Sequence, residues 1–259
     1  MRVDLHNHTK LCNHAVGEIY EYIEKAIESG TEYLGFSDHA PMDFDPKYRM
    51  SFDDMKNYEK DILELKEKYK DKIEILLGYE VDYLKNHMDE RVLNAKVDYL
   101  IGSVHFIDGW GFDNPEFIGK YESEDIDDIW QKYFDTIEEM ANTKLFDIVG
   151  HFDLIKVFKF MPKKDIDMIA KNALLAIKNA NMVLEINGAG LRKPIKELYP
   201  STPLLKLAFE LKIPITFGSD AHEPNQISLY SKEIQDIAKA VGYEECVIFH
   251  NREKKFIKF

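Results

Sequence analysis

Short apolar runs alternate with amphipathic helical patterns along the chain of 259 residues. The apolar runs predict strands at residues 3–5, 33–36, 73–78, 97–102, 148–150, 182–186, 214–217 and 246–249. Most of these runs are continuously apolar, which is typical of parallel strands covered on both faces. Apolar residues at helical spacing predict helices at residues 18–29, 51–69, 125–140, 162–178, 201–211 and 227–241.

This alternation favours a single α/β domain over residues 1–259, because no low-complexity window and no linker rich in Pro, Gly or Ser divides the chain. Repeated pairs of strand and helix favour a closed or nearly closed barrel over an open sheet. Residues 108–122 are rich in Gly and aromatic residues and are predicted to form a long loop. Such a loop is either a functional lid or an ordered surface loop.

Charge and composition exclude several classes of protein. The 34 Lys and Arg against 47 Asp and Glu give a net charge of -13, which argues against a general binder of nucleic acids or anionic membranes. Two Cys cannot form a disulfide scaffold. No apolar run approaches the roughly 18 residues of a membrane helix, and the first residues lack the apolar segment of a signal peptide. We expect a cytoplasmic protein, and no sequence feature specifies an oligomeric state.

Seven of the nine His follow the ends of predicted strands, together with two carboxylates. In chain order these metal-binding residue types are His6, His8, His14, His39, Glu80, His105, His151, Asp220 and His222. In a parallel barrel, the carboxyl ends of all strands open on one face. Nine donors are too many for one ion and suit two or three, and such a multinuclear site favours the hydrolysis of phosphate esters.

The segments around these donors resemble a known family. At residues 4–8, 38–41, 102–106, 109–113, 185–187, 189–193 and 219–222, the chain resembles the PHP (polymerase and histidinol phosphatase) superfamily, and most of all its histidinol-phosphate phosphatases. The resemblance implies a distorted (β/α)7 TIM-like barrel with a trinuclear site on its C-terminal rim. It also implies hydrolysis of L-histidinol phosphate to L-histidinol and phosphate, a step of histidine biosynthesis.

By position, the resemblance implies three sets of ligands for two or three divalent ions, with zinc, manganese and iron as open candidates. The first set is His6, His8, Glu80 and Asp220; the second is Glu80, His105 and His151, with Glu80 bridging; the third is His14, His39 and His222. A metal-bridging hydroxide is expected to attack the phosphorus. Asp220, His222 or a metal-bound water is then available for the proton transfer.

Further residues are implied around the substrate. Arg192 matches a position that presents a cation to the phosphate, whereas Lys156 stands where an Arg is expected and is either a phosphate contact or an ordinary surface lysine. Asp38 and Asp153 adjoin proposed ligands and either orient imidazoles or make local hydrogen bonds.

Two alternatives stay open beside this hypothesis. One is a PHP phosphoesterase that acts on nucleotides or other small phosphate esters. The other is a metal-binding relative without catalytic turnover, although the loss of donors that would indicate it is not seen among the nine positions.

Overall fold

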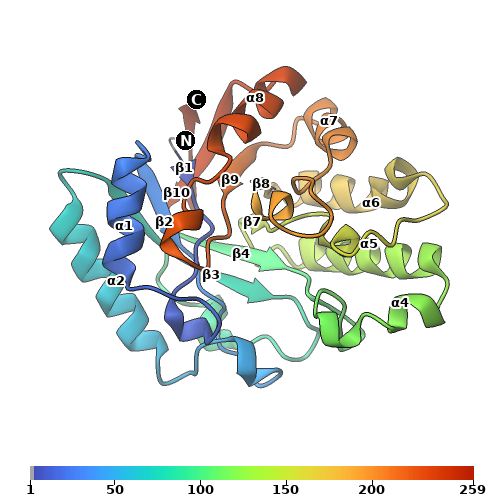
Figure 1. Ribbon diagram of the computed structural model, residues 1–259, viewed down its shortest axis with the longest axis horizontal. Helices are drawn as coiled ribbons and strands as arrows, with labels where there is room; N and C mark the ends of the chain where they lie inside the picture. The colour runs from blue at the N-terminus through green and yellow to red at the C-terminus, as the bar shows by residue number, and fades with distance from the viewer. Residues whose placement is uncertain (1–2) are drawn as a thin grey trace.

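The computed structural model describes residues 3–259, and seven parallel strands form the centre of the fold (Figure 1). They are β1 (Val3–Asp4), β2 (Tyr33–Phe36), β3 (Glu74–Asp82), β4 (Tyr99–Ser103), β7 (Ile148–Val149), β8 (Val183–Asn187) and β9 (Ile215–Gly218). Their order in the sheet follows their order in the chain. The first two residues of the predicted domain lie outside the described residues.

Backbone hydrogen bonds between the first and last strands bring the two edges of the sheet together. The Leu5 N–H donates to the Phe217 carbonyl at 2.8 Å, and the His8 N–H donates to the Ala221 carbonyl at 2.9 Å. Asn7 and Ala221 form a parallel bridge in the same place. The result is a nearly closed barrel of seven parallel strands, which confirms the predicted distorted TIM-like barrel.

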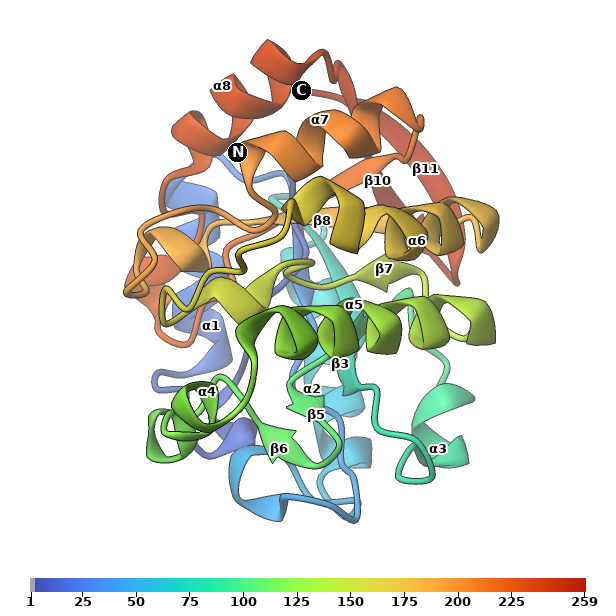
Figure 2. The same cartoon turned by 90° about the vertical axis from the view of Figure 1, so that its right-hand side faces the viewer.

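Six helices cover the outside of the barrel, and α5 and α6 lie side by side (Figures 1 and 2). The six are α1 (Ile19–Glu28), α2 (Met55–Tyr69), α5 (Ile126–Thr143), α6 (Ile166–Asn179), α7 (Thr202–Glu210) and α8 (Ser231–Val241). All six correspond to predicted helices. Helix α8 begins later than predicted, because Ser228 and Tyr230 have positive φ angles and interrupt the helical backbone.

Shorter elements connect the rest of the chain. These are α3 (Glu90–Leu93), α4 (Lys120–Ser123) and the 3-10 turns η1 (Lys10–Cys12), η2 (Pro46–Tyr48), η3 (Pro115–Phe117), η4 (Leu154–Lys156), η5 (Ala189–Leu191) and η6 (Pro224–Gln226). Within residues 3–259, no helix combines the length and the apolar character that a membrane crossing requires.

Large aromatic side chains fill the barrel where small residues leave room. Tyr99 of β4 is fully buried, and its hydroxyl donates to the Leu5 carbonyl at 2.5 Å on the opposite side. A Cβ atom on Gly35 would collide with this hydroxyl, and one on Gly78 would lie 2.6 Å from the Tyr99 ring. Glycine in β2 and β3 therefore lets one tyrosine span the interior, which fixes the strands that carry the site.

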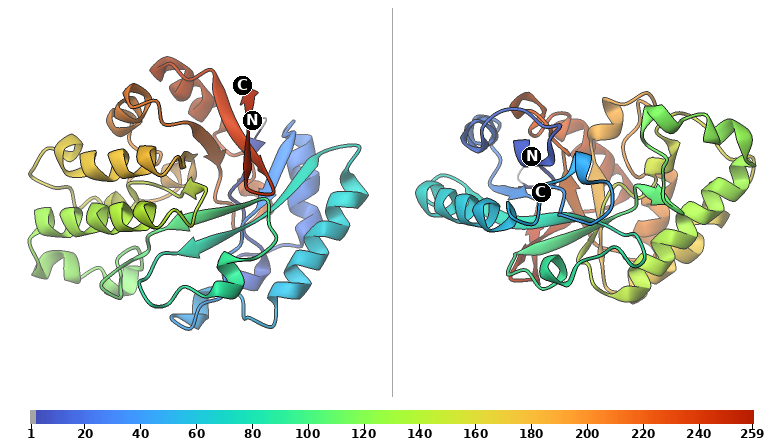
Figure 3. Two further views of the ribbon diagram at one scale, coloured as in Figure 1. Left: turned by 180° about the vertical axis from the view of Figure 1, so that it is seen from behind. Right: turned by 90° about the horizontal axis from the view of Figure 1, so that it is seen from below.

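The predicted strand at residues 246–249 is present but does not join the barrel. It is part of β10 (Glu245–His250), which pairs antiparallel with β11 (Glu253–Lys258). The turn of this hairpin contacts residues that precede β4 and β7: the Asn251 N–H donates to Asp98, and Arg252 donates to the Leu145 carbonyl. The hairpin therefore lies at the N-terminal ends of the strands (Figure 3).

The predicted long loop at residues 108–122 is largely ordered structure. A two-residue turn at Asp108 and Gly109, both with positive φ, joins β5 (Phe106–Ile107) to β6 (Trp110–Gly111). Asp-Gly is a strong hairpin signal, so the sequence did contain this information. The Trp110 Nε1–H donates to the Phe117 carbonyl at 3.2 Å, which ties η3 to the hairpin.

Candidate metal centre

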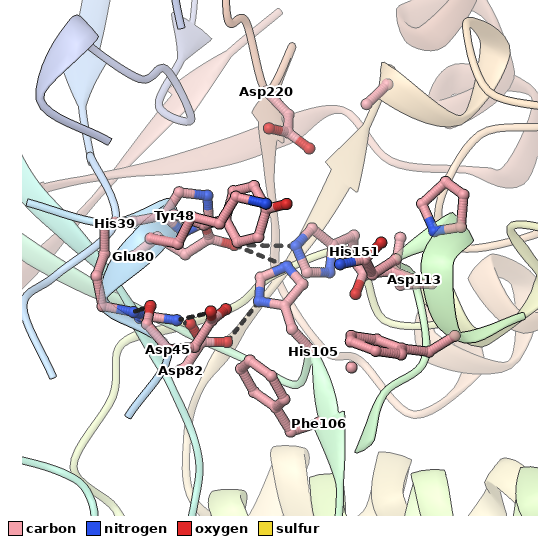
Figure 4. A pocket seen from close by; sticks show the side chains of 18 of the residues that line it. His39, Asp45, Tyr48, Glu80, Asp82, His105, Phe106, Asp113, His151 and Asp220 are labelled. Carbon is pink, nitrogen blue, oxygen red and sulfur yellow. Dashed lines mark hydrogen bonds and ion pairs between the residues drawn. The ribbon is translucent and has the colours of Figure 1, made fainter. Parts of the chain in front are cut away.

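The nine predicted donors meet at the C-terminal ends of the barrel strands around Glu80 of β3. Figure 4 shows Glu80 together with His39, His105, His151 and Asp220. The Glu80 Oε1 atom is 2.9 Å from His151 Nε2 and 3.4 Å from His6 Nε2. Its Oε2 atom is 2.9 Å from His39 Nδ1 and 3.6 Å from His8 Nε2. One carboxylate thus reaches imidazoles that follow three different strands.

The remaining donors surround this carboxylate. His105 Nε2 lies 3.8 Å from Glu80 Oε1. Asp220 Oδ1 lies 3.2 Å from His8 Nε2, and the His14 and His222 Nε2 atoms are 3.0 Å apart. Asp220 has a positive φ of 52°, an uncommon backbone conformation for a residue other than glycine. Such strain is concentrated at functional sites in proteins.

Within this cluster, the donors form groups in which the ligand atoms lie within 4.8 Å of one another. The groups are His6, His8 and Glu80; Glu80, His105 and His151; His14, His39 and His222; and His8, Cys12 and His222. The second and third groups match the sets implied by the family resemblance, and the first contains three members of its four-residue set, without Asp220. Cys12 is fully buried, and burial raises the pKa of its thiol, which opposes a thiolate ligand.

Four of these atoms are buried and make no hydrogen bond of suitable geometry in the described part of the chain, although they lie within ion-pair distance of other donors. They are His6 Nε2, His8 Nε2, His39 Nδ1 and Glu80 Oε2. Buried polar atoms without hydrogen bonds are costly and rare in native proteins. Four such atoms in one cluster therefore call for a common explanation. Bound divalent ions would satisfy all four, so the residues present fit a metal centre.

The cluster forms the floor of a cavity of about 540 Å³. Aromatic side chains line one part of its wall: Phe44, Tyr48, Phe106 and Phe117. Carboxylates also line the cavity: Asp45, Asp82, Asp113 and Glu116. A volume of this kind suits a small molecule that contacts the metal cluster at one end and the aromatic wall at the other.

A comparison with known protein families identifies the family of the chain that carries this cluster. The model of the PHP domain family matches residues 4–189 of the chain. The chain belongs to the PHP domain family. Its relatives include a protein of Deinococcus radiodurans named "probable histidinol-phosphatase", which is 37% identical over 243 residues covering 90% of this chain and 93% of the relative. The histidinol-phosphatase of Bacillus subtilis is 29% identical, over 86% of this chain and 94% of its own.

A solved structure shows the same fold. The histidinol phosphate phosphatase of Lactococcus lactis aligns with a TM-score of 0.82 over 98% of both chains at 22% sequence identity. That enzyme was crystallised with zinc, L-histidinol and phosphate.

Buried carboxylates orient several imidazoles of this PHP domain. Glu185 Oε1 of β8 lies 2.7 Å from His6 Nδ1, and Asp82 Oδ1 of β3 lies 2.5 Å from His105 Nδ1. Each contact directs the opposite Nε2 atom toward the donor cluster. Neither carboxylate was predicted. The sequence did contain signals for both. Glu185 lies near the end of the predicted strand 182–186, and Asp82 comes two residues after Glu80.

Of the two carboxylates that were predicted to orient imidazoles, one does and one does not. Asp38 Oδ1 lies 3.3 Å from His8 Nδ1. Asp153 instead accepts the Ser201 N–H at 2.9 Å and pairs with Lys156 Nζ at 2.9 Å. The imidazole-orienting role predicted for Asp153 is therefore wrong, and its local hydrogen bonds correspond to the alternative that the sequence left open.

The two residues predicted to contact the phosphate differ in how their charged groups are held. Arg192 Nη2 donates to the carbonyls of Ser219 and Asp220, each at 2.9 Å, while Nη1 is buried without a partner among residues 3–259. Lys156 is buried with only 1% of its surface exposed, and Nζ donates to Glu197 and to the Leu198 carbonyl, both at 2.8 Å. Its ammonium is already paired and Lys156 does not line the cavity, so neither the phosphate contact nor the surface lysine that the sequence left open describes it.

Burial and neighbouring charges shift the pKa values of the donors in opposite directions. Burial opposes the imidazolium of His105, but the carboxylates of Asp82 and Glu80 outweigh it and raise the pKa to about 10. Burial lowers the pKa of His39 to about 4. Burial also opposes the charged form of Glu80, yet the surrounding imidazoles hold its pKa well below the usual range. Glu80 therefore stays ionised, as a bridging ligand must.

Proposed function

We propose that this PHP domain hydrolyses L-histidinol phosphate to L-histidinol and phosphate. The observation that carries the proposal is the convergence of seven His, Glu80 and Asp220 in one cluster beside a cavity, in a chain whose relatives over most of its length are named histidinol-phosphatases. The ligands proposed for two or three divalent ions are His6, His8, His14, His39, Glu80, His105, His151, Asp220 and His222. Zinc, manganese and iron all suit these donors.

The side chains of the chain itself then have distinct roles. Bound divalent ions supply the water-derived nucleophile near neutral pH and offset the charge of the phosphate oxygens. Arg192 is the proposed cation for a phosphate oxygen, because its Nη2 is held by the Ser219 and Asp220 carbonyls next to the cluster. In the reaction, the oxygen of water bonds to phosphorus, the bond from phosphorus to the ester oxygen breaks, and the leaving alkoxide takes up a proton. Asp220 and His222 both line the cavity and are the candidates for moving that proton.

The proposed reaction also indicates where the chain acts. Amino-acid biosynthesis takes place in the cytoplasm, and neither Cys12 nor Cys246 is part of a disulfide, as that reducing compartment favours. We therefore propose a cytoplasmic enzyme whose partner is a small phosphate ester.

A panel of phosphate esters tests the proposal. We expect the purified, metal-loaded chain to release phosphate from L-histidinol phosphate with a kcat/KM at least about 100-fold above that for p-nitrophenyl phosphate or mononucleotides. Phosphate release is followed colorimetrically, and a chelated sample serves as the control. Equal or higher rates on nucleotides would favour the alternative phosphoesterase. No release from any ester, with the ions bound, would favour the relative without turnover.

A further inference from the structure

One carboxylate of the cavity, Asp113, forms no ion pair with a Lys or Arg among the described residues. Asp113 follows β6, lines the cavity and lies close enough to His105 and His151 to interact with both electrostatically (Figure 4). Among the residues that the structure describes, no Lys or Arg pairs with it. Asp82, which also lines the cavity, pairs with Arg49 Nη1 at 2.9 Å. Asp113 therefore differs from Asp82 in having only imidazoles, and no Lys or Arg, as neighbouring positive groups.

An unpaired carboxylate is unfavourable in a site for a phosphate ester. It repels the phosphate and weakens the binding of any substrate that carries only negative charge. Burial raises the pKa of Asp113; the nearby His105 opposes this shift, and Asp82 adds to it. A positive charge supplied by the substrate would remove the cost, because a carboxylate and an ammonium form a charge-assisted hydrogen bond.

The hairpin beneath Asp113 holds this carboxylate in place. Trp110 and Phe112 are both buried: Phe112 packs edge-to-face on Tyr133 of α5 at 5.3 Å between ring centroids, and Trp110 packs on Tyr121 at 4.8 Å. The tight turn at Asp108 and Gly109 closes the other end. Because its neighbours are fixed, Asp113 loses little conformational freedom when it binds a ligand.

We propose that Asp113 binds the ammonium group of an amino-alkyl phosphate substrate and so sets the substrate class of this site. The inference rests on the proposed function and deepens it. In L-histidinol phosphate the ammonium is on the carbon next to the ester methylene, which puts its nitrogen about 3 Å from the ester oxygen. A phosphate held beside His105 and His151 therefore brings the ammonium within reach of the Asp113 carboxylate.

Two matched substrates and two variants test this role. The substrates are L-histidinol phosphate and 3-(imidazol-4-yl)propyl phosphate, which lacks only the amine. The first variant is Asp113→Asn, which removes the charge and keeps the shape. The control is Asp108→Asn, which makes the same change at an exposed position in the same hairpin, where Asn also tolerates the positive φ. Steady-state kinetics and metal content are measured for each protein.

We expect the wild type to prefer the amine-bearing ester by roughly 10- to 100-fold in kcat/KM. Asp113→Asn should reduce this preference to near one, with unchanged metal content, and Asp108→Asn should keep it. If Asp113→Asn lowers kcat/KM for both esters equally or loses metal, the inference is overturned while the proposed function stands. If the wild type hydrolyses both imidazolyl esters no faster than p-nitrophenyl phosphate, the proposed function itself fails.

Discussion

Replacement of Glu80 by glutamine should lower the hydrolysis of phosphate esters by roughly 1,000-fold and remove at least one bound ion per chain. The reason is the central position of this carboxylate, whose two oxygens lie 2.9 Å from His151 and His39 and within 3.8 Å of three further imidazoles. Glutamine keeps the shape but removes the charge and one of the two acceptor oxygens. Phosphate release and metal analysis of the same preparation measure the two effects.

The matched control is Glu74→Gln, which makes the same change earlier in β3. Glu74 is 39% exposed and contacts His250 at 3.3 Å, far from the rim. We expect its activity and metal content to equal those of the wild type. Circular dichroism of both variants monitors folding. A Glu80→Gln protein that keeps full activity and full metal content would contradict the bridging role of Glu80.

The second large effect is expected from Glu185→Gln, at a residue that touches no proposed substrate position. Glu185 Oε1 orients His6, and Oε2 accepts the His151 N–H at 2.8 Å and the Asn187 side-chain amide at 3.0 Å. Both oxygens of Glu185 accept hydrogen bonds, whereas glutamine has one oxygen and one NH2 group. The NH2 group cannot accept a hydrogen bond from His6 on one side or from the His151 N–H on the other, so the hydrogen bonds that hold the His6 ring are weakened. The expected result is a 10- to 100-fold weaker metal affinity, typical of partners that orient a ligand.

A positioning role predicts more than lower activity. Activity of Glu185→Gln should be restored by excess metal, because the ligands themselves are intact, whereas Glu80→Gln should not respond. Metal titrations followed by activity distinguish the two cases, with Glu210→Gln at the exposed end of α7 as the control. Failure of excess metal to restore any activity to a folded Glu185→Gln protein would show that Glu185 does not act through His6.

Much of the barrel could be predicted from sequence because its strands are covered on both faces. Burial on both sides demands continuously apolar runs, and that pattern identified all seven barrel strands. The same pattern misled at residues 246–249, since a strand buried in a hairpin over the barrel end is equally apolar. Its partner β11 was missed because four of its six residues are charged and it is mostly exposed.

The donors were predictable for a topological reason. Parallel strands bring their carboxyl ends to one rim, so the residues that follow each strand become neighbours without any knowledge of distances. Pairings that depend on side-chain direction were not predictable. The contact of His6 with Glu185 joins residues 179 positions apart. The ion pairs of Lys156 with Asp153 and Glu197 depend on how η4 packs against the segment before Tyr199.

The claim that the nine donors form one multinuclear centre is tested most directly by anomalous X-ray diffraction. Crystals of the full chain, grown with Mn²⁺ and inorganic phosphate, are measured at the manganese absorption edge. We predict two or three anomalous peaks inside the cluster, one of them between Glu80 and the imidazoles of His105 and His151. A single peak, or peaks confined to positions away from these donors, would contradict the multinuclear centre.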